Sequence, residues 1–345
     1  MEQVTSPMAI FDAVQRGGAA PDWVRDGVDR AWLGGNGHPD VRLIAVSENA
    51  TFRVLIDGVP SMVVRLSQPG YVGDPANVRS ELQWIEAIAA ETAIDTPAPI
   101  RGTNGELVQF LTSPDGREWM TVAFEFVTGR ILEEDTDLVP YFAPIGAATA
   151  VLHQHARGWT KPAGFVRFDW TLDDMVGENA RWGSWERAAL TDADREVLRR
   201  AQTQALGVLA DLGPAVLERG LIHADLRPSN IMIEGDALTI IDFDDSGFGF
   251  YLYDFAAALT FYEHLPEATR MAASWLEGYA QVSPLTRPQL EAAAALSQIR
   301  RLTMLGWSTT HREDSLPPDL WNANLPGTVE VSARYLQTPL WLVEA

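Results

Sequence analysis

Residues 221–247, "LIHADLRPSNIMIEGDALTIIDFDDSG", place five aspartates beside apolar segments. The segments "IMIEG" and "LTIID" are typical of two strands joined by a tight turn. Acidic side chains next to buried strands normally require a cation or a reaction, because burying an unpaired charge costs free energy. The stretch therefore predicts a functional site built on a hairpin.

The first half of this stretch has the pattern H-x-D-x-x-x-x-N, formed by His223, Asp225 and Asn230, and Asp242 follows at the end of the second strand. Phosphoryl transfer from a nucleotide needs one carboxylate to orient the attacking hydroxyl. It also needs an amide oxygen and a second carboxylate to hold Mg²⁺ against the phosphates. Asp225, Asn230 and Asp242 supply this set. The alternative is an acidic turn with a helix cap, or a structural cation site.

The composition excludes several classes of protein. The 345 residues suffice for two domains or one two-lobed unit, and 46% hydrophobic residues exclude a mainly disordered chain. A net charge of −21 argues against nucleic-acid binding, which requires a basic face. The absence of cysteine excludes disulfides and thiol nucleophiles. The first residues lack the pattern of a signal peptide, and no run approaches ~20 apolar residues, so we expect no membrane span and a cytoplasmic location.

The pattern of the chain changes near residue 127. Before it, we expect short helices at 11–14 and 23–32, three strands within 41–67, a helix over 75–91 and strands at 106–111 and 119–127. After it, helical periodicity dominates outside the hairpin, at 139–157, 172–186, 191–212, 267–281, 287–306 and 328–336. The sequence therefore predicts an α+β protein with a small sheet-rich domain, 1–127, and a larger helical domain, 128–345.

The segments "HADLRPSNIM" and "IDFDDSG" resemble the catalytic loop and metal-binding strand of the aminoglycoside phosphotransferase and choline kinase group. These small-molecule kinases have a protein-kinase-like fold, with a small antiparallel-sheet lobe and a larger helical lobe. The resemblance covers most of the chain. It implies that Asp225 is the catalytic base, that Asn230 and Asp242 are Mg²⁺ ligands, and that His223 packs under the loop. It also implies nucleotide binding by 1–127 and acceptor binding by 128–345.

The family grips the nucleotide phosphates with a basic residue, often lysine, on the third strand. The segment "MVVRLS" offers Arg65 there, because the only lysine, Lys161, lies far downstream. Arginine forks onto two oxygens where lysine is a point charge, so the geometry must differ. Glu81 in "VRSELQWI" resembles the acidic partner on the following helix. The alternatives are an exposed arginine on an edge strand and a solvated glutamate on the helix.

Two further segments resemble parts of the family pattern. "FEFVTG" is similar to the hinge, which implies that backbone groups of Glu125 and Val127 bind the purine. Asp254 in "YLYDFAAAL" matches an aspartate that braces the catalytic loop, although it could equally cap the first amides of its own helix.

These residues predict a Mg²⁺-dependent kinase that uses ATP or GTP to phosphorylate a hydroxyl group of a small molecule. An aminoglycoside, an amino alcohol and a homoserine-like metabolite all fit as acceptors. The expected partners are thus a nucleotide and a small-molecule acceptor, with no nucleic acid and no membrane, and the oligomeric state stays open. The alternatives are a kinase-like protein that phosphorylates protein Ser or Thr, and a non-catalytic nucleotide-binding pseudokinase.

Overall fold

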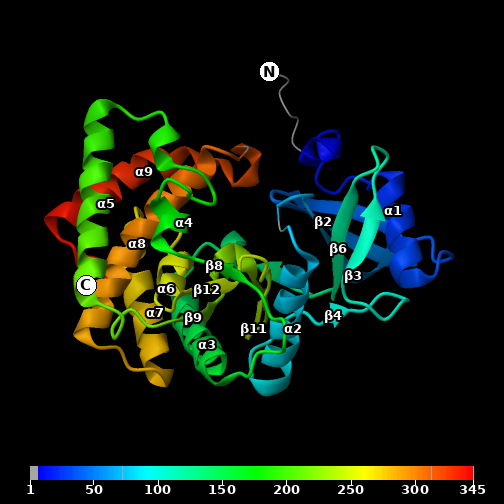
Figure 1. Cartoon of the computed structure of the whole chain (residues 1–345), viewed down its shortest axis with the longest axis horizontal. Coiled ribbons are helices and arrows are strands. Elements are labelled where there is room, and N and C mark those ends of the chain that lie inside the picture. Colours follow the sequence, from blue (N-terminus) through cyan, green and yellow to red (C-terminus); the bar gives the residue numbers. More distant parts are fainter. Residues whose placement is uncertain (1–6, 72, 312, 345) are drawn as a thin grey trace. The chain divides into compact units, whose positions relative to one another are not determined.

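The computed structural model describes residues 7–71, 73–311 and 313–344 (Figure 1). The first six residues, on which part of the signal-peptide expectation rests, lie outside this range. The chain divides into two compact units. Unit 1 comprises Met1–Thr128 and Lys161–Val166, and unit 2 comprises Gly129–Thr160 and Arg167–Ala345. Across the described residues, no helix combines the length and apolar composition needed to cross a membrane.

Unit 1 is built on one antiparallel sheet whose strand order is β1-β2-β3-β6-β4, with β5 paired to another part of β6. The strands are β1 (Asp40–Val46), β2 (Asn49–Ile56), β3 (Val59–Ser67), β4 (Pro99–Ile100), β5 (Gln109–Thr112) and β6 (Glu118–Glu125). The helical elements are η1 (Pro7–Phe11), α1 (Asp22–Val28), the π-helical turn η2 (Asp29–Leu33) and α2 (Pro75–Glu91). The expected three strands within 41–67 and the helix over 75–91 are confirmed.

The two faces of strand β3 differ: one packs into the hydrophobic core, and the other carries Arg65. Its alternate residues Met62, Val64 and Leu66 are buried in the hydrophobic core that also contains Phe11. Successive side chains of a strand point to opposite faces, so Arg65 lies on the other face. That face is where the side chain of Arg65 meets α2, whose start is fixed by an Asp74 cap and Pro75 at its first turn.

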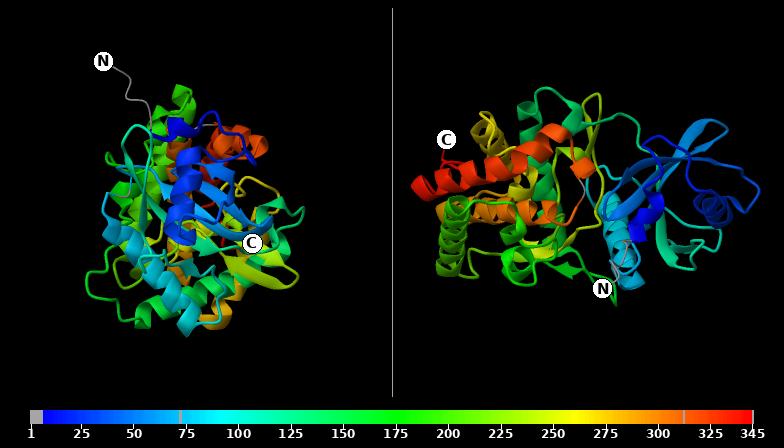
Figure 2. Two further views of the ribbon diagram at one scale, coloured as in Figure 1. Left: turned by 90° about the vertical axis from the view of Figure 1, so that its right-hand side faces the viewer. Right: turned by 90° about the horizontal axis from the view of Figure 1, so that it is seen from above.

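Unit 2 is mainly helical and centres on α8 (Arg287–Ser308), whose residues 292–307 are all buried. In Figures 1 and 2, α8 (orange) packs against α5 (green) and α9 (red). The other main helices of the unit are α3 (Val139–Gly158), α4 (Leu172–Val176), α5 (Asp192–Leu212), α6 (Tyr253–Ala258), α7 (Ala268–Val282) and α9 (Pro318–Gln337). The short 3-10 helices are η3 (Leu132–Glu134), η4 (Trp185–Arg187), η5 (Pro228–Asn230) and η6 (Glu313–Ser315).

Two small sheets set among these helices carry the acidic stretch. The expected hairpin is confirmed as β10 (Ile231–Glu234) paired with β11 (Ala237–Ile240), and β10 also pairs with β7 (Arg130–Ile131) on its other side. A second sheet, which the sequence reading missed, joins β9 (Arg219–Ile222), β12 (Gly247–Phe250) and β8 (Phe168–Asp169). The stretch 221–247 therefore leaves one sheet, forms a loop, makes the hairpin and returns to the first sheet.

The expected helix over 172–186 is wrong. Helix α4 ends at Val176, and only the short 3-10 helix η4 follows, at Trp185–Arg187. A capping box between Thr171 and Asp174 starts α4, but Gly177 and Gly183 lie in conformations that a helix cannot continue. Gly183 has φ of +107°, a region that side-chain-bearing residues avoid.

Other expected helix boundaries also differ from the structure. Helix α9 starts ten residues before the expected residue 328, at Pro318, and continues through an internal proline, Pro326. The short helix expected at 11–14 is instead a 3-10 helix that ends at Phe11, because residues 12 and 13 form a turn.

Helices α3 and α7 approach each other closely through two glycines. A Cβ placed on Gly146 would lie 2.0 Å from the carbonyl oxygen of Trp275, and one placed on Gly278 would lie 1.9 Å from that of Ala143. Contacts this short cannot exist, so the helices would have to move apart to accept any side chain. The close packing of α3 on α7 therefore depends on both glycines.

We expect Gly146→Ala to lower the free energy of unfolding by about 2 kcal/mol, because overpacking outweighs the better helix propensity of alanine. Urea unfolding followed by circular dichroism measures this effect. Gly207→Ala on α5 is the matched control, since its Cβ would meet nothing within 4 Å. It should leave stability unchanged or raise it by up to about 1 kcal/mol. Equal stability of the two variants would contradict the packing argument.

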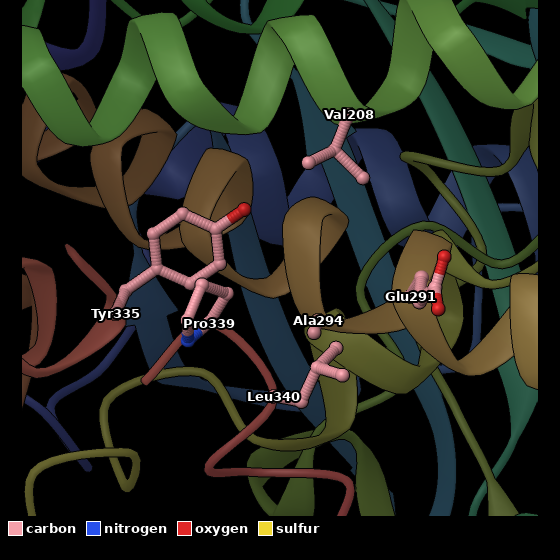
Figure 3. Close-up of a pocket in the computed structure, with 6 residues that line it drawn as sticks. All are labelled: Val208, Glu291, Ala294, Tyr335, Pro339 and Leu340. Carbon is pink, nitrogen blue, oxygen red and sulfur yellow. The ribbon is translucent and has the colours of Figure 1, made fainter. Parts of the chain in front are cut away.

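A small hollow lies between α5, α8 and the segment after α9 (Figure 3). Its lining is mostly apolar and consists of Val208, Glu291, Ala294, Tyr335, Pro339 and Leu340. Burial raises the pKa of Tyr335 to about 12, so its hydroxyl stays protonated. Glu291 lies nine residues before Arg300 on α8, about 14 Å along the helix, so this hollow is separate from the site described below.

Candidate active site

The loop of residues 223–230, which joins β9 to β10, has a tightly defined backbone. Ala224 adopts φ of +68°, the left-handed region, which is uncommon for a residue other than glycine. The amide of Arg227 donates to Asp225 O at 2.9 Å, and that of Asn230 donates to Arg227 O at 2.8 Å. The loop thus turns twice within eight residues. Arg227 is the N-cap of η5, so Asp225 does not cap this helix.

Asp254 braces the start of this loop. Its Oδ1 accepts from Ala224 N at 2.7 Å and its Oδ2 accepts from His223 N at 3.1 Å. Oδ2 also meets His153 Nε2 at 2.9 Å, and His153 Nδ1 lies 2.9 Å from the hydroxyl of Tyr279. The N-cap of α6 is Leu252, so these hydrogen bonds do not serve the cap that the sequence left open. A buried polar chain from α7 and α3 therefore supports the left-handed turn.

His223 links the loop to the strand end that carries Asp242. Its Nε2 donates to Ile241 O at 3.2 Å, and its Nδ1 accepts from Asp225 N at 3.4 Å. Burial lowers the pKa of His223, so the ring is neutral, as this pair of one donor and one acceptor requires. The ring also packs on Phe243, with centroids 4.5 Å apart. His223 is 0% exposed and thus packs beneath the loop.

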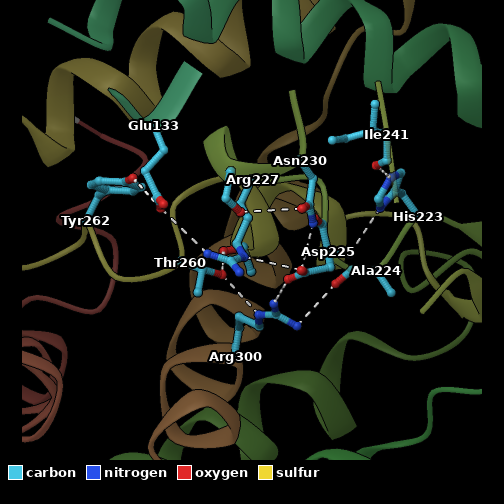
Figure 4. A network of polar contacts seen from close by, with 12 residues as sticks. Glu133, His223, Ala224, Asp225, Arg227, Asn230, Ile241, Thr260, Tyr262 and Arg300 are labelled. Atoms are coloured by element: carbon cyan, nitrogen blue, oxygen red, sulfur yellow. Dashed lines mark hydrogen bonds and ion pairs between the residues drawn. The ribbon is translucent and has the colours of Figure 1, made fainter. Parts of the chain in front are cut away.

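The carboxylate of Asp225 is held on both oxygens (Figure 4). Oδ1 pairs with a terminal nitrogen of Arg300. Oδ2 accepts from Asn230 Nδ2 at 2.9 Å and from Arg227 Nε at 3.2 Å. Asn230 Nδ2 also donates to Asp225 O at 2.8 Å, so the amide nitrogen faces Asp225 and fixes the orientation of the amide oxygen.

Sequence reasoning missed both arginines. Arg227 extends from Asp225 toward Glu133, with 3.7 Å between Nη1 and Oε1, and the hydroxyl of Tyr262 donates to the same oxygen at 3.1 Å. Burial alone would lower the pKa of Arg227, but the charges of Asp225 and Glu133 outweigh it and raise the pKa. The only signal in the sequence was the position of the arginine two residues after Asp225.

Arg300 lies 75 residues from Asp225 in the sequence and is 0% exposed. Burial by itself would lower the pKa of Arg300, but its interactions with Tyr253 and Asp225 raise the pKa above the usual value, so it is charged. A charged residue within the apolar pattern of "AALSQIRRLTML" was the available sequence signal. It marks a buried position that needs a partner, without naming that partner.

Asp242 directly follows a residue that is hydrogen-bonded to the loop. The amide of Ile241 donates to Asn230 O at 3.0 Å, which brings the strand end beside Asn230. Asp242 has φ of +62°, and non-glycine residues in this region cluster at functional sites. Carboxylate and amide oxygens are the hard donors that Mg²⁺ prefers, so Asn230 and Asp242 fit this ion chemically.

The turn of residues 242–246 is held by Arg167 and Trp170. Arg167 Nε donates to Ser246 O at 2.6 Å, and its Nη2 donates to the carbonyls of Phe243 and Asp244. Trp170 Nε1 donates to Asp245 O at 2.8 Å. These donors directly precede and directly follow β8, in a segment that the sequence reading placed in no element. They fix the backbone around Asp242.

No three His, Asp or Glu side chains within the described ranges converge to hold a metal ion by themselves. This is the usual situation for Mg²⁺ in nucleotide enzymes, because the ion takes one or two protein ligands, several waters and the phosphate oxygens of the substrate.

Within unit 1, Arg65 and Glu81 form a bidentate pair, with Nη1 to Oε1 and Nη2 to Oε2 each at 2.8 Å. Their side chains are 6% and 1% exposed, and β3 lies between β2 and β6. The alternatives of an edge-strand arginine and a solvated glutamate are therefore wrong. A buried, forked pair of this kind is geometrically specific.

The residues expected to form a hinge lie where β6 ends. Glu125 is the last residue of β6 and is exposed, and its amide donates to Ala98 O at 2.9 Å. Val127, two residues later, lies outside any strand and is half-buried.

Comparison with known proteins places this arrangement in a family. Residues 40–292 match the sequence profile described as "Phosphotransferase enzyme family". This chain belongs to that family. A solved structure of a microcompartment-associated aminopropanol kinase is similar, with a TM-score of 0.82 and 30% identity, covering 92% of this chain and 98% of that one. The resemblance to phosphotransferases and the expected kinase-like fold are thereby confirmed.

Curated relatives align with a smaller share of the chain. An amicoumacin kinase of Bacillus subtilis (strain 168) is 23% identical over 64% of this chain and 62% of its own length. A homoserine kinase of Afipia carboxidovorans is 31% identical over 63% of each chain. The chain thus aligns with just under two thirds of the length of these relatives. A spectinomycin phosphotransferase is 11% identical with a TM-score of 0.64, covering 91% of this chain and 98% of that one, so the two chains share a fold.

Proposed function

We propose that this protein is a Mg²⁺-dependent kinase that transfers the γ-phosphoryl group of ATP to a hydroxyl group of a small alcohol bearing an ammonium group. The observation that carries the proposal is the Asp225 carboxylate, which is held by Arg300, Arg227 and Asn230 on a loop braced by Asp254. Such fixation suits a reaction whose catalysis is mostly positioning and charge compensation.

In the proposed reaction, the acceptor oxygen forms a bond to the γ-phosphorus while the bond to the bridging oxygen breaks and ADP leaves. Asp225 orients the hydroxyl and accepts its proton. Asn230 and Asp242 hold Mg²⁺, which compensates the charge of the phosphates when bound. His223 and Asp254 keep the loop and the strand end in register, so they act through Asp225 and Asp242 without touching substrate.

Unit 1 supplies the proposed grip on the nucleotide. Arg65 contacts phosphate oxygens, and Glu81 fixes its guanidinium by accepting two of its five N–H donors. Backbone groups of Glu125 and Val127 bind the purine. Residues 1–127 are thus the proposed nucleotide-binding lobe, and residues 128–345 the catalytic and acceptor lobe.

The acceptor class follows from the similar proteins. Aminopropanol and homoserine are both small alcohols with an ammonium group, and these names describe the acceptors of a similar structure and of curated relatives. The net charge of −21 gives this chain a negative field that favours a cationic acceptor over an anionic one. The proposed location is the cytoplasm, where ATP is available.

The test is an ADP-release assay with Mg-ATP and Mg-GTP over amino alcohols, homoserine, aminoglycosides, neutral diols and a generic protein. We expect turnover with ATP and ammonium-bearing alcohols, and little with neutral diols of the same size. Nucleotide binding without ADP release over the whole panel would favour a nucleotide-binding protein without catalysis. Turnover only with protein would favour a Ser/Thr kinase.

The assignment of Arg65 has its own test. We expect Arg65→Met to raise the Kd for Mg-ATP by about 10- to 100-fold, because a charge-assisted contact to phosphate is lost. Isothermal titration calorimetry measures the change. Arg53→Met is the matched control, since Arg53 lies exposed on the neighbouring strand β2 and should keep the Kd of the parent protein. An unchanged Kd in Arg65→Met would remove Arg65 from the phosphate site.

A further inference from the structure

Arg300 is anchored through all three nitrogens of its guanidinium. Nε donates to Thr260 Oγ1 at 3.0 Å, Nη1 donates to Ala224 O at 3.1 Å and to the hydroxyl of Tyr253 at 3.2 Å, and Nη2 pairs with Asp225 Oδ1. The guanidinium carbon also lies 5.0 Å from the ring centre of Trp182 and 5.4 Å from that of Tyr253. The planar group therefore has one orientation.

Burying the charged guanidinium of Arg300 costs free energy, so its presence in the core calls for an explanation. Desolvating a guanidinium and a carboxylate costs several kcal/mol each, and an apolar pair of similar volume often stabilises a fold as well or better. Arg300 is 0% exposed, whereas the Asp225 side chain retains 15% of its exposure. A buried cation thus pairs with a carboxylate that still reaches solvent, which is the arrangement expected where the carboxylate must meet a substrate.

The neighbouring Arg301 is equally buried but points elsewhere. Its Nη1 donates to Glu263 Oε2 at 2.8 Å, its Nε to Thr328 Oγ1 at 2.9 Å, and its Nη2 to Asn324 O at 3.0 Å. Consecutive helix residues differ by about 100° around the axis, so the two arginines face different parts of unit 2. Arg301 joins α8 to α9, and Arg300 joins α8 to the 223–230 loop. Arg301 therefore serves the packing of α8, whereas Arg300 serves the placement of Asp225.

The hydrogen bonds to the Asp225 carboxylate leave one lone pair available to a substrate. A carboxylate offers about four lone pairs, two on each oxygen. Oδ2 accepts from Asn230 and Arg227, which occupies both of its lone pairs, while Oδ1 accepts from Arg300. One lone pair of Oδ1 remains for an acceptor hydroxyl. Because Arg300 binds the other lone pair of Oδ1, it sets the direction of the remaining one.

We propose that Arg300 is a positioning residue for phosphoryl transfer, which fixes the carboxylate of Asp225 so that one lone pair of Oδ1 faces the acceptor hydroxyl. This inference rests on the proposed kinase function. Arg300 touches neither nucleotide nor acceptor, so its contribution passes through Asp225. Its removal should therefore matter only while Asp225 is present.

The test is a double-mutant cycle measured by ADP release. We expect Arg300→Met to lower kcat by about 100-fold with the KM for ATP changed less than about 3-fold, since positioning affects the reaction step. In an Asp225→Asn background, the same change should lower the residual kcat by less than about 3-fold, because the two residues act as a unit. Arg300→Lys should recover about 10-fold of the loss, since it restores the charge but not the fork.

Arg301→Met is the matched control. It should lower the thermal unfolding midpoint, since it leaves Glu263 buried and unpaired, yet keep kcat within about 3-fold of the parent protein. If Arg300→Met fails to fold, Arg300→Lys takes its place in the cycle. Equal losses from the Arg300 change in both backgrounds, or a parent-like kcat in Arg300→Met, would overturn the inference.

A parent protein without turnover on any acceptor would refute the proposed function rather than this inference. The crystal structure of Arg300→Met, or of Arg300→Lys where the first variant does not fold, then decides the question without an assay. We expect the Asp225 side chain to leave the orientation it has beside Arg300. An unchanged Asp225 orientation would overturn the positioning role.

Discussion

Asp225→Asn should lower kcat by about 1,000-fold or more, while the Kd for Mg-ATP stays within about twofold, because the variant loses the proton acceptor but no nucleotide contact. Asparagine matches the shape of aspartate, but its amide nitrogen is a donor. It would face the donors of Arg300, or those of Arg227 and Asn230, in a position built for a carboxylate. Both the proton transfer and the orientation of the side chain are affected.

Coupled ADP release gives kcat, and calorimetry gives the Kd. Asp236→Asn is the matched control, since Asp236 lies exposed in the turn of the β10–β11 hairpin, in the same acidic stretch. It should retain the activity and the ATP affinity of the parent protein. Turnover in Asp225→Asn close to that of the parent would refute the assignment of the base, whatever the acceptor.

Asp242→Ala should abolish the part of ATP binding that depends on Mg²⁺. We expect the Kd for ATP in the presence of Mg²⁺ to rise by about 100-fold, to the value measured with EDTA, because the carboxylate that holds the ion is lost. The Kd measured with EDTA should not change. Calorimetric titrations of both proteins with and without Mg²⁺ give the four values needed.

The left-handed backbone of Asp242 calls for a second variant. Alanine at φ of +62° is strained, whereas asparagine tolerates this region, so Asp242→Asn separates the loss of charge from the backbone effect. We expect Asp242→Asn to show most of the loss seen with alanine. Mg²⁺-dependent binding that persists in the asparagine variant would mean that the charge of Asp242 does not hold the ion.

Local patterns predicted much of this fold. The turns "SENA" and "DGVP" predicted three strands within 41–67, and the Pro75 start with Val78, Leu82 and Ile85 on one face predicted α2. The helix expected over 172–186 was wrong because α4 ends at Gly177, and the positive φ of Gly183 is incompatible with a helix further on. Strands β8 and β9 were missed because they pair with β12, which lies far from both in the sequence, and no tight turn marks this pairing.

The part of the candidate site that lies within one short segment was predictable from the sequence. His223, Asp225 and Asn230 lie within eight residues, so their spacing alone indicated a shared loop. The supporting residues come from distant segments. Arg167 reaches the carbonyls of the 242–246 turn from about 79 residues away, and nothing in its local sequence distinguishes it from a surface arginine.

The hairpin, the H-x-D-x-x-x-x-N loop and the chemistry they suit could be predicted from the sequence, because they depend on residues close together in the chain. The charges that surround Asp225 depend on long-range packing. Arg300 and Arg301 are identical neighbours in the sequence, and a rotation of about 100° along α8 sends one to Asp225 and the other to Glu263. That choice depends on how α8 packs among the loop, α6 and α9, and long-range packing of this kind is not encoded in any local pattern.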